Sequence, residues 1–191
     1  MNTQAQRAGQ IIRSVHEFVK KRAPLRIRTD IVELIEQTLP LVELQAQAQY
    51  VQLLWNPPAG LPAVLADKVL IEQVILNLTR NAIEAMQQIA PALRYLRIRT
   101  SYDKASDSVA VEVIDRGHGI SQEVADQLFS PFFSTKTSGM GMGLNICRTT
   151  IEFHGGKLTH EDNPDGGTIF RFVLPAAPDD NNDEQEPAAS S

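Results

Sequence analysis

Two asparagines one helical turn apart are the first residues whose chemistry stands out. Asn77 and Asn81 lie in the segment KVLIEQVILNLTRNAIEAMQQ, whose apolar residues recur at helical spacing and predict a helix over 68–88. Residues four apart share one side of a helix, and Glu84 continues that side. Asparagine is a mediocre helix former, so a pair inside a helix needs a reason. Either the two side chains are solvated, or they bind Mg²⁺ or another polar ligand, since Mg²⁺ takes oxygen ligands.

A carboxylate between a predicted strand and a glycine-containing turn forms the second group. Asp115 ends the alternating segment SVAVEVID, and Gly117 and Gly119 follow it in DRGHG. A carboxylate in this place, with glycines leaving space around it, can accept a hydrogen bond from an exocyclic amine such as that of adenine. An aspartate that caps an ordinary β-turn is the alternative. This segment alone leaves both interpretations open.

Glycine at every second position marks the third group. The stretch SGMGMGL directly precedes a segment that predicts a helix over 143–153, and its glycines are Gly139, Gly141 and Gly143. Glycine lets the backbone approach a ligand closely, and a helix N-terminus attracts anions such as phosphate. A flexible turn is the alternative. The spacing is that of neither a P-loop nor the dinucleotide fingerprint, in which Leu144 would have to be glycine.

The order of these segments is far more specific than any one of them. The phenylalanine-rich stretch FSPFFSTK separates the second group from the third, and GGT at 166–168 closes the series. This order resembles the ATP-binding domain of bacterial sensor histidine kinases, a branch of the GHKL ATPase superfamily, over residues 26–174. NLTRNAIEAM resembles the N box, DRGHGI the first glycine box, FSPFFSTK the F box, and GMGMGLNICRTTIEFHGG the second glycine box with its helix.

The resemblance implies a role for each matching residue. Asn81 is expected to coordinate Mg²⁺, and Asn77 to lie on the phosphate side, so that the two form the catalytic pair. Asp115 is expected to bind the adenine amine, with Gly117 and Gly119 shaping that wall of the pocket. The implied cofactors are ATP and Mg²⁺.

A lid over the nucleotide is implied for residues from about 128 to 141. Lys136 in this lid would neutralise phosphate charge, with a solvated lysine as an equal alternative. Backbone N–H groups at the start of the following helix would bind the phosphates, and a threonine would line the adenine pocket. The remaining nucleotide-binding residues implied in this way are Glu84, Gly139, Gly141, Gly143, Leu144 and Thr168.

One departure from the family pattern concerns a charged residue of the N box. Many relatives carry a basic residue three places after the second asparagine, whereas this chain has Glu84 there and Arg80 beside the asparagine. Which of the two reaches the nucleotide stays open. The pattern NLxRNAxEAM does occur in a recognisable subgroup of these kinases.

A second departure concerns the phosphoacceptor histidine. His16 is followed by an acidic residue, but no proline follows at the expected distance, and residues 1–23 resemble the C-terminal part of the second dimerisation-hairpin helix. The acceptor is therefore expected upstream of Met1. The implied partners are the dimerisation and phosphoacceptor domain of a parent kinase and the receiver domain of a response regulator. Of the other histidines, His154 is expected as a cation at a helix end and His160 on a strand surface.

The elements that must position these groups mix helix and strand. Strands are predicted in LRIRT, YVQLLW, LRYLRIRTSY, SVAVEVID, KLTHED and TIFRFVL, and helices over 31–47, 68–88, 121–127 and 143–153. This predicts an α+β fold, a two-layer sandwich of a mixed β-sheet and about three helices, preceded by part of a dimerisation helix. The ATP-binding domain is expected to span 24–175.

Composition and charge narrow the function further. The net charge is −5, and the segment 176–191 carries five of the 23 acids and no base, which leaves 18 acids against 18 bases in the body. The segment is expected to be a disordered acidic tail. A neutral body without a basic stretch argues against nucleic-acid binding. A lone cysteine excludes an internal disulfide framework and fits a reducing compartment. We expect a cytoplasmic fragment with no direct membrane contact, whether or not its parent is membrane-anchored.

Two rival functions remain at this point. Other GHKL ATPases typically place a glutamate, acting as general base, where this chain has Asn77, and an asparagine cannot activate water in that way. Asn77 therefore favours phosphoryl transfer over hydrolysis. The second rival is a regulatory ATP-binding module, or a serine kinase, that acts on a protein partner. A fold in which all of these segments are ordinary turns is a remote third alternative.

Overall fold

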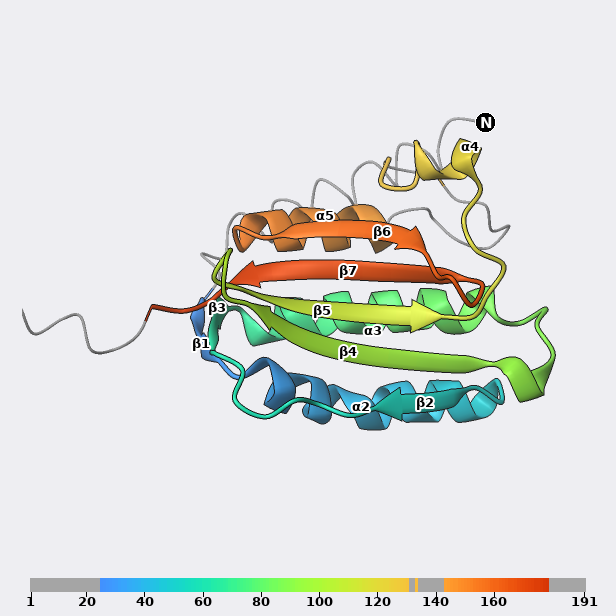
Figure 1. Cartoon of the computed structure of the whole chain (residues 1–191), viewed down its shortest axis with the longest axis horizontal. Coiled ribbons are helices and arrows are strands. Elements are labelled where there is room, and N and C mark those ends of the chain that lie inside the picture. Colours follow the sequence, from blue (N-terminus) through green and yellow to red (C-terminus); the bar gives the residue numbers. More distant parts are fainter. Residues whose placement is uncertain (1–24, 131–132, 134–142, 179–191) are drawn as a thin grey trace, which may run out of the picture.

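A five-stranded mixed sheet forms one layer of the protein. The computed structural model describes residues 25–130, 133 and 143–178. Within them the strand order is β2-β4-β5-β7-β6, with β2 parallel to β4 and every other neighbouring pair antiparallel (Figure 1). The strands are β2 (Gln52–Trp55), β4 (Tyr95–Asp103), β5 (Ser108–Asp115), β6 (Lys157–Asp162) and β7 (Thr168–Pro175).

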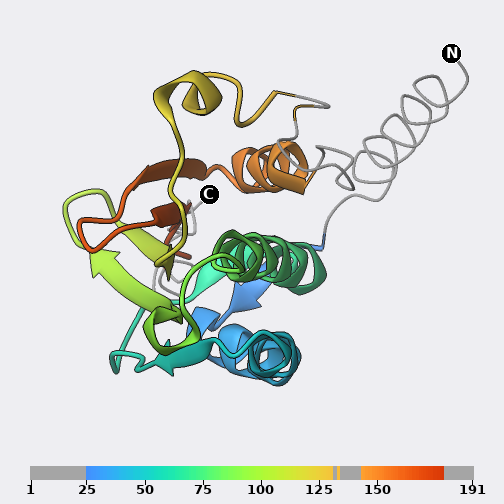
Figure 2. The same cartoon turned by 90° about the vertical axis from the view of Figure 1, so that its right-hand side faces the viewer.

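Three helices form the second layer, on one face of this sheet (Figure 2). They are α2 (Ile31–Ala48), α3 (Lys68–Ala85) and α5 (Gly143–Phe153), and α3 packs against both of the others. The predicted two-layer α+β sandwich is therefore confirmed. The short helix α4 (Gln122–Ala125) lies beyond the β6 edge of the sheet (Figure 1).

Alternation along the strands builds the core between the two layers. On β5, Val111 and Val113 face the helices, and on β7 Phe172 does the same at 0% exposure. Burying such an aromatic side chain stabilises the fold by about 1.5–3 kcal/mol. On α3 the residues facing the sheet are buried at helical spacing: Ile71, Val74, Ile75, Leu78 and Ala82. The predicted apolar face of this helix is confirmed, so the opposite, polar side is free to serve a site.

Aspartate side chains fix where two of the helices begin. Asp30 Oδ1 accepts the N–H groups of Val32 and Glu33 at 2.8 and 3.2 Å, and Asp67 Oδ1 accepts the N–H of Leu70 at 3.3 Å. Each bond satisfies a donor that the first turn of a helix leaves without a partner. Both predicted helix starts are therefore confirmed.

His154 does not have the predicted role. It is 3% exposed, its Nε2 accepts the backbone N–H of Asp67 at 3.0 Å, and its Nδ1 lies 2.7 Å from the carbonyl oxygen of Thr150. Because Nε2 accepts, Nδ1 must carry the proton, and the ring is neutral. Burial lowers the pKa of His154. The prediction of a cation at the end of α5 is wrong, since the ring joins that end to the start of α3.

The differences from the predicted elements lie in short segments and at ends. The sequence prediction missed β3 (Val64–Ala66), which pairs with β1 (Ile27–Thr29), and the 3₁₀ turn η1 (Pro91–Leu93). Helix α3 ends at Ala85 rather than at residue 88. His160 lies on strand β6 as predicted and is half-buried, with its ring 5.9 Å from that of Phe129 and 6.2 Å from that of Phe170.

The described part of the chain continues past β7. Ala176 forms a bridge with Val64, the Ala177 N–H donates to the carbonyl oxygen of Ala63 at 2.7 Å, and the Arg28 guanidinium donates to the carbonyl oxygen of Pro178. The first three residues of the predicted disordered tail, 176–178, are thus ordered against β3 and β1, whereas the predicted hairpin segment and the acidic residues of the tail lie outside the described residues. The division into domains stays a prediction. Among the helices that are described, none has the length and apolar character that a membrane crossing requires.

Candidate nucleotide-binding site

The carboxylate of Asp115 is buried at the end of β5. It is 1% exposed, and its Oδ1 accepts the backbone N–H groups of Gly117 at 2.7 Å and Thr168 at 3.2 Å. Burial raises the pKa of Asp115 to about 6, against the two hydrogen bonds, which lower it. Both bonds go to Oδ1, which leaves Oδ2 as the acceptor for a ligand donor. Thr168, expected in the same pocket, therefore does lie beside Asp115.

Two glycines let the backbone close tightly around this carboxylate. A Cβ at Gly117 would lie 2.7 Å from the Cβ of Ala85 and 2.8 Å from Asp115 Oδ1. Gly167 has φ +96°, and a Cβ there would lie 2.4 Å from the carbonyl oxygen of Asp115. Real Cβ atoms do not approach other atoms this closely, so each position requires glycine. Gly119, at φ +72°, also adopts the left-handed conformation that favours glycine.

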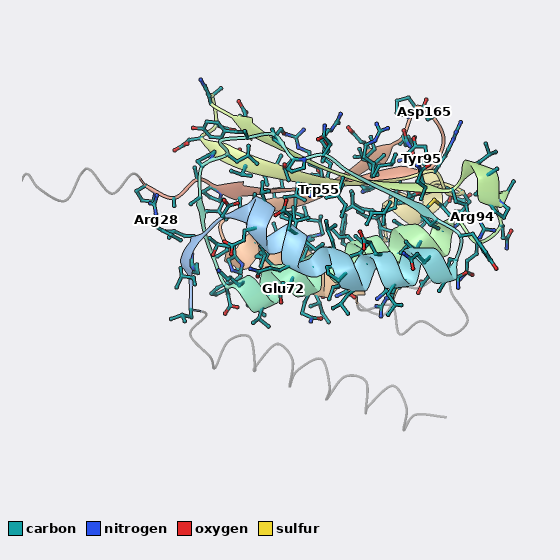
Figure 3. The ribbon with its side chains drawn as sticks, turned by 90° about the horizontal axis from the view of Figure 1, so that it is seen from below. Arg28, Trp55, Glu72, Arg94, Tyr95 and Asp165 are labelled. Atoms are coloured by element: carbon teal, nitrogen blue, oxygen red, sulfur yellow. The ribbon has the colours of Figure 1, made fainter. Side chains whose placement is uncertain are left out.

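The loop 163–167, which carries Gly167, is held in place by one of its own side chains and by side chains from other segments. Asn163 Nδ2 donates to the Asp115 carbonyl oxygen at 2.8 Å, and Arg116 Nε donates to the carbonyl oxygen of Asp165 at 3.0 Å. Figure 3 shows Tyr95 and Asp165 together at one end of the sheet, where the Tyr95 hydroxyl lies 3.5 Å from Asp165 Oδ2. The Arg116 guanidinium lies 5.9 Å from the Tyr95 ring centroid. These contacts fix both walls around Asp115.

Helix α3 connects the carboxylate to the asparagines. The His118 N–H donates to the carbonyl oxygen of Ala85 at 3.3 Å, so the Asp115 turn rests on the last residue of α3. Asn81 and Asn77 precede Ala85 by four and eight residues, which places all three on one side of the helix. Eight residues span about 12 Å of helix. Asp115 and the two asparagines therefore share one face of the molecule.

The first asparagine contacts the beginning of α5. A Cβ at Gly143 would lie 3.6 Å from Asn77 Oδ1, which is ordinary contact distance. Arg80 Nη2 donates to the same Oδ1 at 2.9 Å, and Arg80 Nε lies 4.0 Å from Glu84 Oε1. The buried Cys147 of α5 lies with its Sγ 4.0 Å from the carbonyl oxygen of Val74 in α3. The first turn of α5 is thereby held against the polar side of α3.

The segment before the glycine-rich stretch is anchored to α5 as well. Asn145 Nδ2 donates to the carbonyl oxygen of Phe129 at 2.8 Å, and Leu144 packs its side chain against the core. Lys136, Gly139 and Gly141 lie outside the described residues, so their expected contacts stay predictions.

Several residues that build the site escaped the sequence prediction. Ala85, Asn163 and Gly167 support Asp115, and Arg80 supports Asn77. The sequence indicated a role for only one of them, Gly167, because it belongs to the GGT motif that ends the series of family motifs. Alanine and asparagine at loop or helix ends carry no such signal.

The described residues contain no ready-made cluster of metal-binding side chains, since no three His, Cys, Asp or Glu side chains among them are grouped as a metal site. Asn81 is half-buried on the polar side of α3 and offers one carboxamide oxygen. Mg²⁺ suits such a site, because it binds through one or two protein oxygens and completes its shell with phosphates and water.

A buried carboxylate lies at one end of α3, and the N-terminus of α5 lies farther along the polar side of the same helix, within an α+β sandwich. Residues 66–178 match the family described as histidine kinase-, DNA gyrase B-, and HSP90-like ATPase, and the chain belongs to that family. It is the ATPase domain of the type found in sensor histidine kinases, and its family membership implies the use of a nucleotide.

The similar proteins are longer sensor kinases. The C4-dicarboxylate transport sensor protein DctS of Rhodobacter capsulatus is 45% identical over 92% of this chain and 26% of its own length. The sensor protein FixL of Bradyrhizobium diazoefficiens is 45% identical over 91% of this chain and 34% of its own length. The chain thus spans about a quarter to a third of these relatives.

Solved structures agree with this assignment. The catalytic domain of the histidine kinase ThkA is 33% identical and superposes with a TM-score of 0.69 over 79% of this chain and 95% of that domain. A second ThkA structure, solved in complex with the response regulator protein TrrA, is 29% identical and has a TM-score of 0.71 over 92% of this chain and 49% of ThkA.

Proposed function

We propose that this chain binds ATP with Mg²⁺ and transfers the γ-phosphoryl group to a histidine that lies outside it, in a longer kinase chain. From there the group would pass to an aspartate of a response-regulator receiver domain, the kind of partner with which ThkA was solved. The observation that carries the proposal is the shared face of α3. Asp115 rests on its end at Ala85, and Asn81 and Asn77 follow on the same side toward the N-terminus of α5.

Each residue then has a role that its surroundings support. The Asp115 carboxylate accepts a hydrogen bond from the adenine amine, because its Oδ1 is already held by two N–H groups. Asn81 offers an oxygen to Mg²⁺, which when bound neutralises charge on the phosphates. Gly143 lies at the start of α5, where backbone N–H groups and the helix dipole attract phosphate. Positioning and charge neutralisation supply most of the catalysis in phosphoryl transfer.

Asn77 supports transfer to a protein side chain rather than to water. It contacts Arg80 and Gly143, and its carboxamide has no basicity with which to activate a water molecule. Slow hydrolysis of ATP is therefore the expected activity of this chain by itself.

The test is phosphorylation of a phosphoacceptor hairpin from a sensor histidine kinase, supplied in trans with γ-labelled ATP. We expect label on the hairpin that is lost in acid and stable in base, as phosphohistidine is. Transfer of the label to an added receiver domain supports the complete sequence of steps. Acid-stable label on serine, or tight ATP binding without transfer to any hairpin tested, would favour the serine kinase or the regulatory module instead.

A further inference from the structure

Arg94 holds the ends of two helices with one side chain. It lies between η1 and β4, and its guanidinium donates to three backbone carbonyl oxygens: from Nη1 to Gln49 at 2.7 Å, from Nε to Ile89 at 2.8 Å and from Nη2 to Gln87 at 2.9 Å. The first acceptor is the C-cap of α2, and the other two follow the end of α3 at Ala85.

These carbonyl groups need a donor from outside their own helices. Carbonyl groups at and just after the C-terminal end of a helix find no partner within the helix, and this end carries partial negative charge. Neither α2 nor α3 has a basic residue in its last turn. The guanidinium of Arg94 therefore supplies positive charge at two helix ends that have no base of their own. A hydrogen bond from a charged donor favours the bound arrangement by about tenfold or more.

The end of α3 that Arg94 holds is also the end that supports Asp115. The Ala85 carbonyl oxygen accepts the His118 N–H at 3.3 Å, and Ala85 leaves no room for a Cβ at Gly117. Two of the carbonyl groups that Arg94 binds follow Ala85 by two and four residues. A shift of this short segment would move Ala85 away from the turn, so Arg94 helps to set the place of the turn.

The backbone of Arg94 leads directly to the part of β4 that lies beside Asp115. Leu96, two residues further on, is the register partner of Asp115 in β5. The hydroxyl of the intervening Tyr95 lies 3.5 Å from Oδ2 of Asp165, in the loop 163–167. Figure 3 shows Arg94, Tyr95 and Asp165 at the same end of the sheet. Two neighbouring side chains thus contact the α3 end and the loop, which are the two segments that enclose the carboxylate.

We propose that Arg94 is a positioning residue for the base of the nucleotide: it holds the end of α3 against the Asp115 turn, so that the carboxylate stays where it accepts the adenine amine. This inference rests on the proposed function, which puts adenine at Asp115. The guanidinium of Arg94 acts through the backbone, because three carbonyl oxygens occupy it. Loss of Arg94 should therefore weaken the recognition of adenine and leave the Mg²⁺-dependent part of binding unchanged.

A double-mutant cycle with Asp115 tests the proposal, using the non-hydrolysable analogue AMPPNP titrated calorimetrically against the whole chain. Arg94→Gln removes the charge and leaves too few N–H groups for three carbonyl oxygens. If the Asp115 turn is then aligned in about a tenth of the molecules, the affinity falls about tenfold. In the Asp115→Asn background the same change should cost at most about threefold, because the charged acceptor is already gone. Equal losses in the two backgrounds, or a changed ratio of affinities with and without Mg²⁺, would overturn the proposal.

Two further variants control for charge and for side-chain shape. Arg94→Lys keeps the charge and a donor, so its loss of affinity should be smaller than that of Arg94→Gln. Arg99→Gln removes an equal charge from the same strand, where the side chain is 57% exposed and pairs with Glu112. Its affinity for AMPPNP should stay within about twofold of the wild type. A loss as large as that of Arg94→Gln would make the effect one of net charge, and the proposal would fail.

Amide hydrogen exchange without nucleotide separates this inference from the proposed function. The His118 N–H reports the contact with Ala85, and the N–H of the buried Val111 in the central strand β5 reports the stability of the whole fold. Arg94→Gln should accelerate exchange at His118 by about tenfold more than at Val111. Equal acceleration at both amides would show a loss of global stability alone and would contradict the positioning role. If the wild-type chain fails to bind AMPPNP, the proposed function fails, while the exchange at His118 still decides whether Arg94 holds the turn.

Discussion

Replacing Asp115 with asparagine should make the folded chain more stable at neutral pH while it weakens nucleotide binding. The carboxyl group is 1% exposed, and burial raises its pKa from 3.8 to about 6. Below pH 3.8 the folded and unfolded states both hold the proton. Between pH 3.8 and 6 the unfolded state releases it first, so the free energy of unfolding falls as the pH rises. Above pH 6 the full loss persists.

The size of this loss follows from the pKa shift. A shift of about two units corresponds to about 3 kcal/mol, which is an upper bound on what Asp115→Asn can restore at pH 7. The variant keeps an oxygen for the N–H groups of Gly117 and Thr168, so the turn should retain its geometry. The free energy of unfolding is measured by urea denaturation at pH 4 to 7, with the single tryptophan, Trp55, as fluorescent probe. The difference between the proteins should grow from near zero at pH 4 to its maximum above pH 6.

Nucleotide binding should change in the opposite direction. A hydrogen bond from the adenine amine to a charged acceptor contributes about 1.5–3 kcal/mol, so the affinity for AMPPNP should fall by about tenfold to a hundredfold. In the wild type the affinity should also fall as the pH drops below about 6, because protonation removes the charged acceptor, and Asp115→Asn should lack this dependence. Asp165→Asn, which removes an exposed carboxylate at the same end of the sheet, is the control for a general charge effect. A variant of Asp115 that binds AMPPNP as tightly as the wild type and gains no stability at pH 7 would refute the assignment.

Three further predictions test other parts of the site. Asn81→Ala should remove the Mg²⁺-dependent part of the affinity for AMPPNP, measured by titrations with and without Mg²⁺. The midpoint of urea unfolding should change little. An unchanged dependence of the affinity on Mg²⁺ would exclude the metal role. Gly117→Ala should destabilise the fold by about 1–3 kcal/mol, because the new Cβ would meet the Ala85 carbonyl oxygen at 2.8 Å, whereas the matched control Gly143→Ala meets its nearest atom at 3.6 Å. His154→Phe should lower the free energy of unfolding at pH 7.5, because the hydrogen bonds of the imidazole are lost. The variant should also respond less to acid, because the pKa of the buried imidazole is lowered from 6.5 and the wild type therefore loses stability as the pH falls. Parallel curves of unfolding free energy for the two proteins between pH 5 and 7.5 would contradict this.

The long periodic elements could be predicted from the sequence because their hydrophobic pattern reports burial directly. Helix α3 and strand β5 each present one continuous apolar face, and the structure confirms both. The three residues of β3 are too few to show a period, and they form a strand only because β1 offers a partner. His154 was predicted wrongly for a related reason. The N–H group that its Nε2 accepts belongs to Asp67, 87 residues away, so only the tertiary structure decides whether this imidazole is charged or neutral.

For the site, residue type predicted the groups with distinctive chemistry and missed the groups that support them. Asn77 stands out because a carboxamide inside a helix is locally unfavourable, and Asp115 stands out because two glycines follow a carboxylate at a strand end. Asn163 is an ordinary loop residue by sequence, yet its amide secures the backbone of Asp115. Arg80 reads as a solvated helix residue until the bond to Asn77 is seen. Such supporting roles depend on the approach of segments that the local sequence does not specify.

The pair of helices α3 and α5 explains how the site keeps its shape without a ligand. At one end His154 of α5 accepts a hydrogen bond from Asp67, the N-cap of α3. Further along, the Cys147 sulfur lies 4.0 Å from the carbonyl oxygen of Val74, and Gly143 at the start of α5 lies beside Asn77. Contacts at both positions fix the rotation and the axial position of α5 relative to α3, and with them the place of its N-terminus. The phosphate end of the proposed site is therefore preorganised by the same helix that carries the asparagines, so the free energy of nucleotide binding need not be spent on aligning α5.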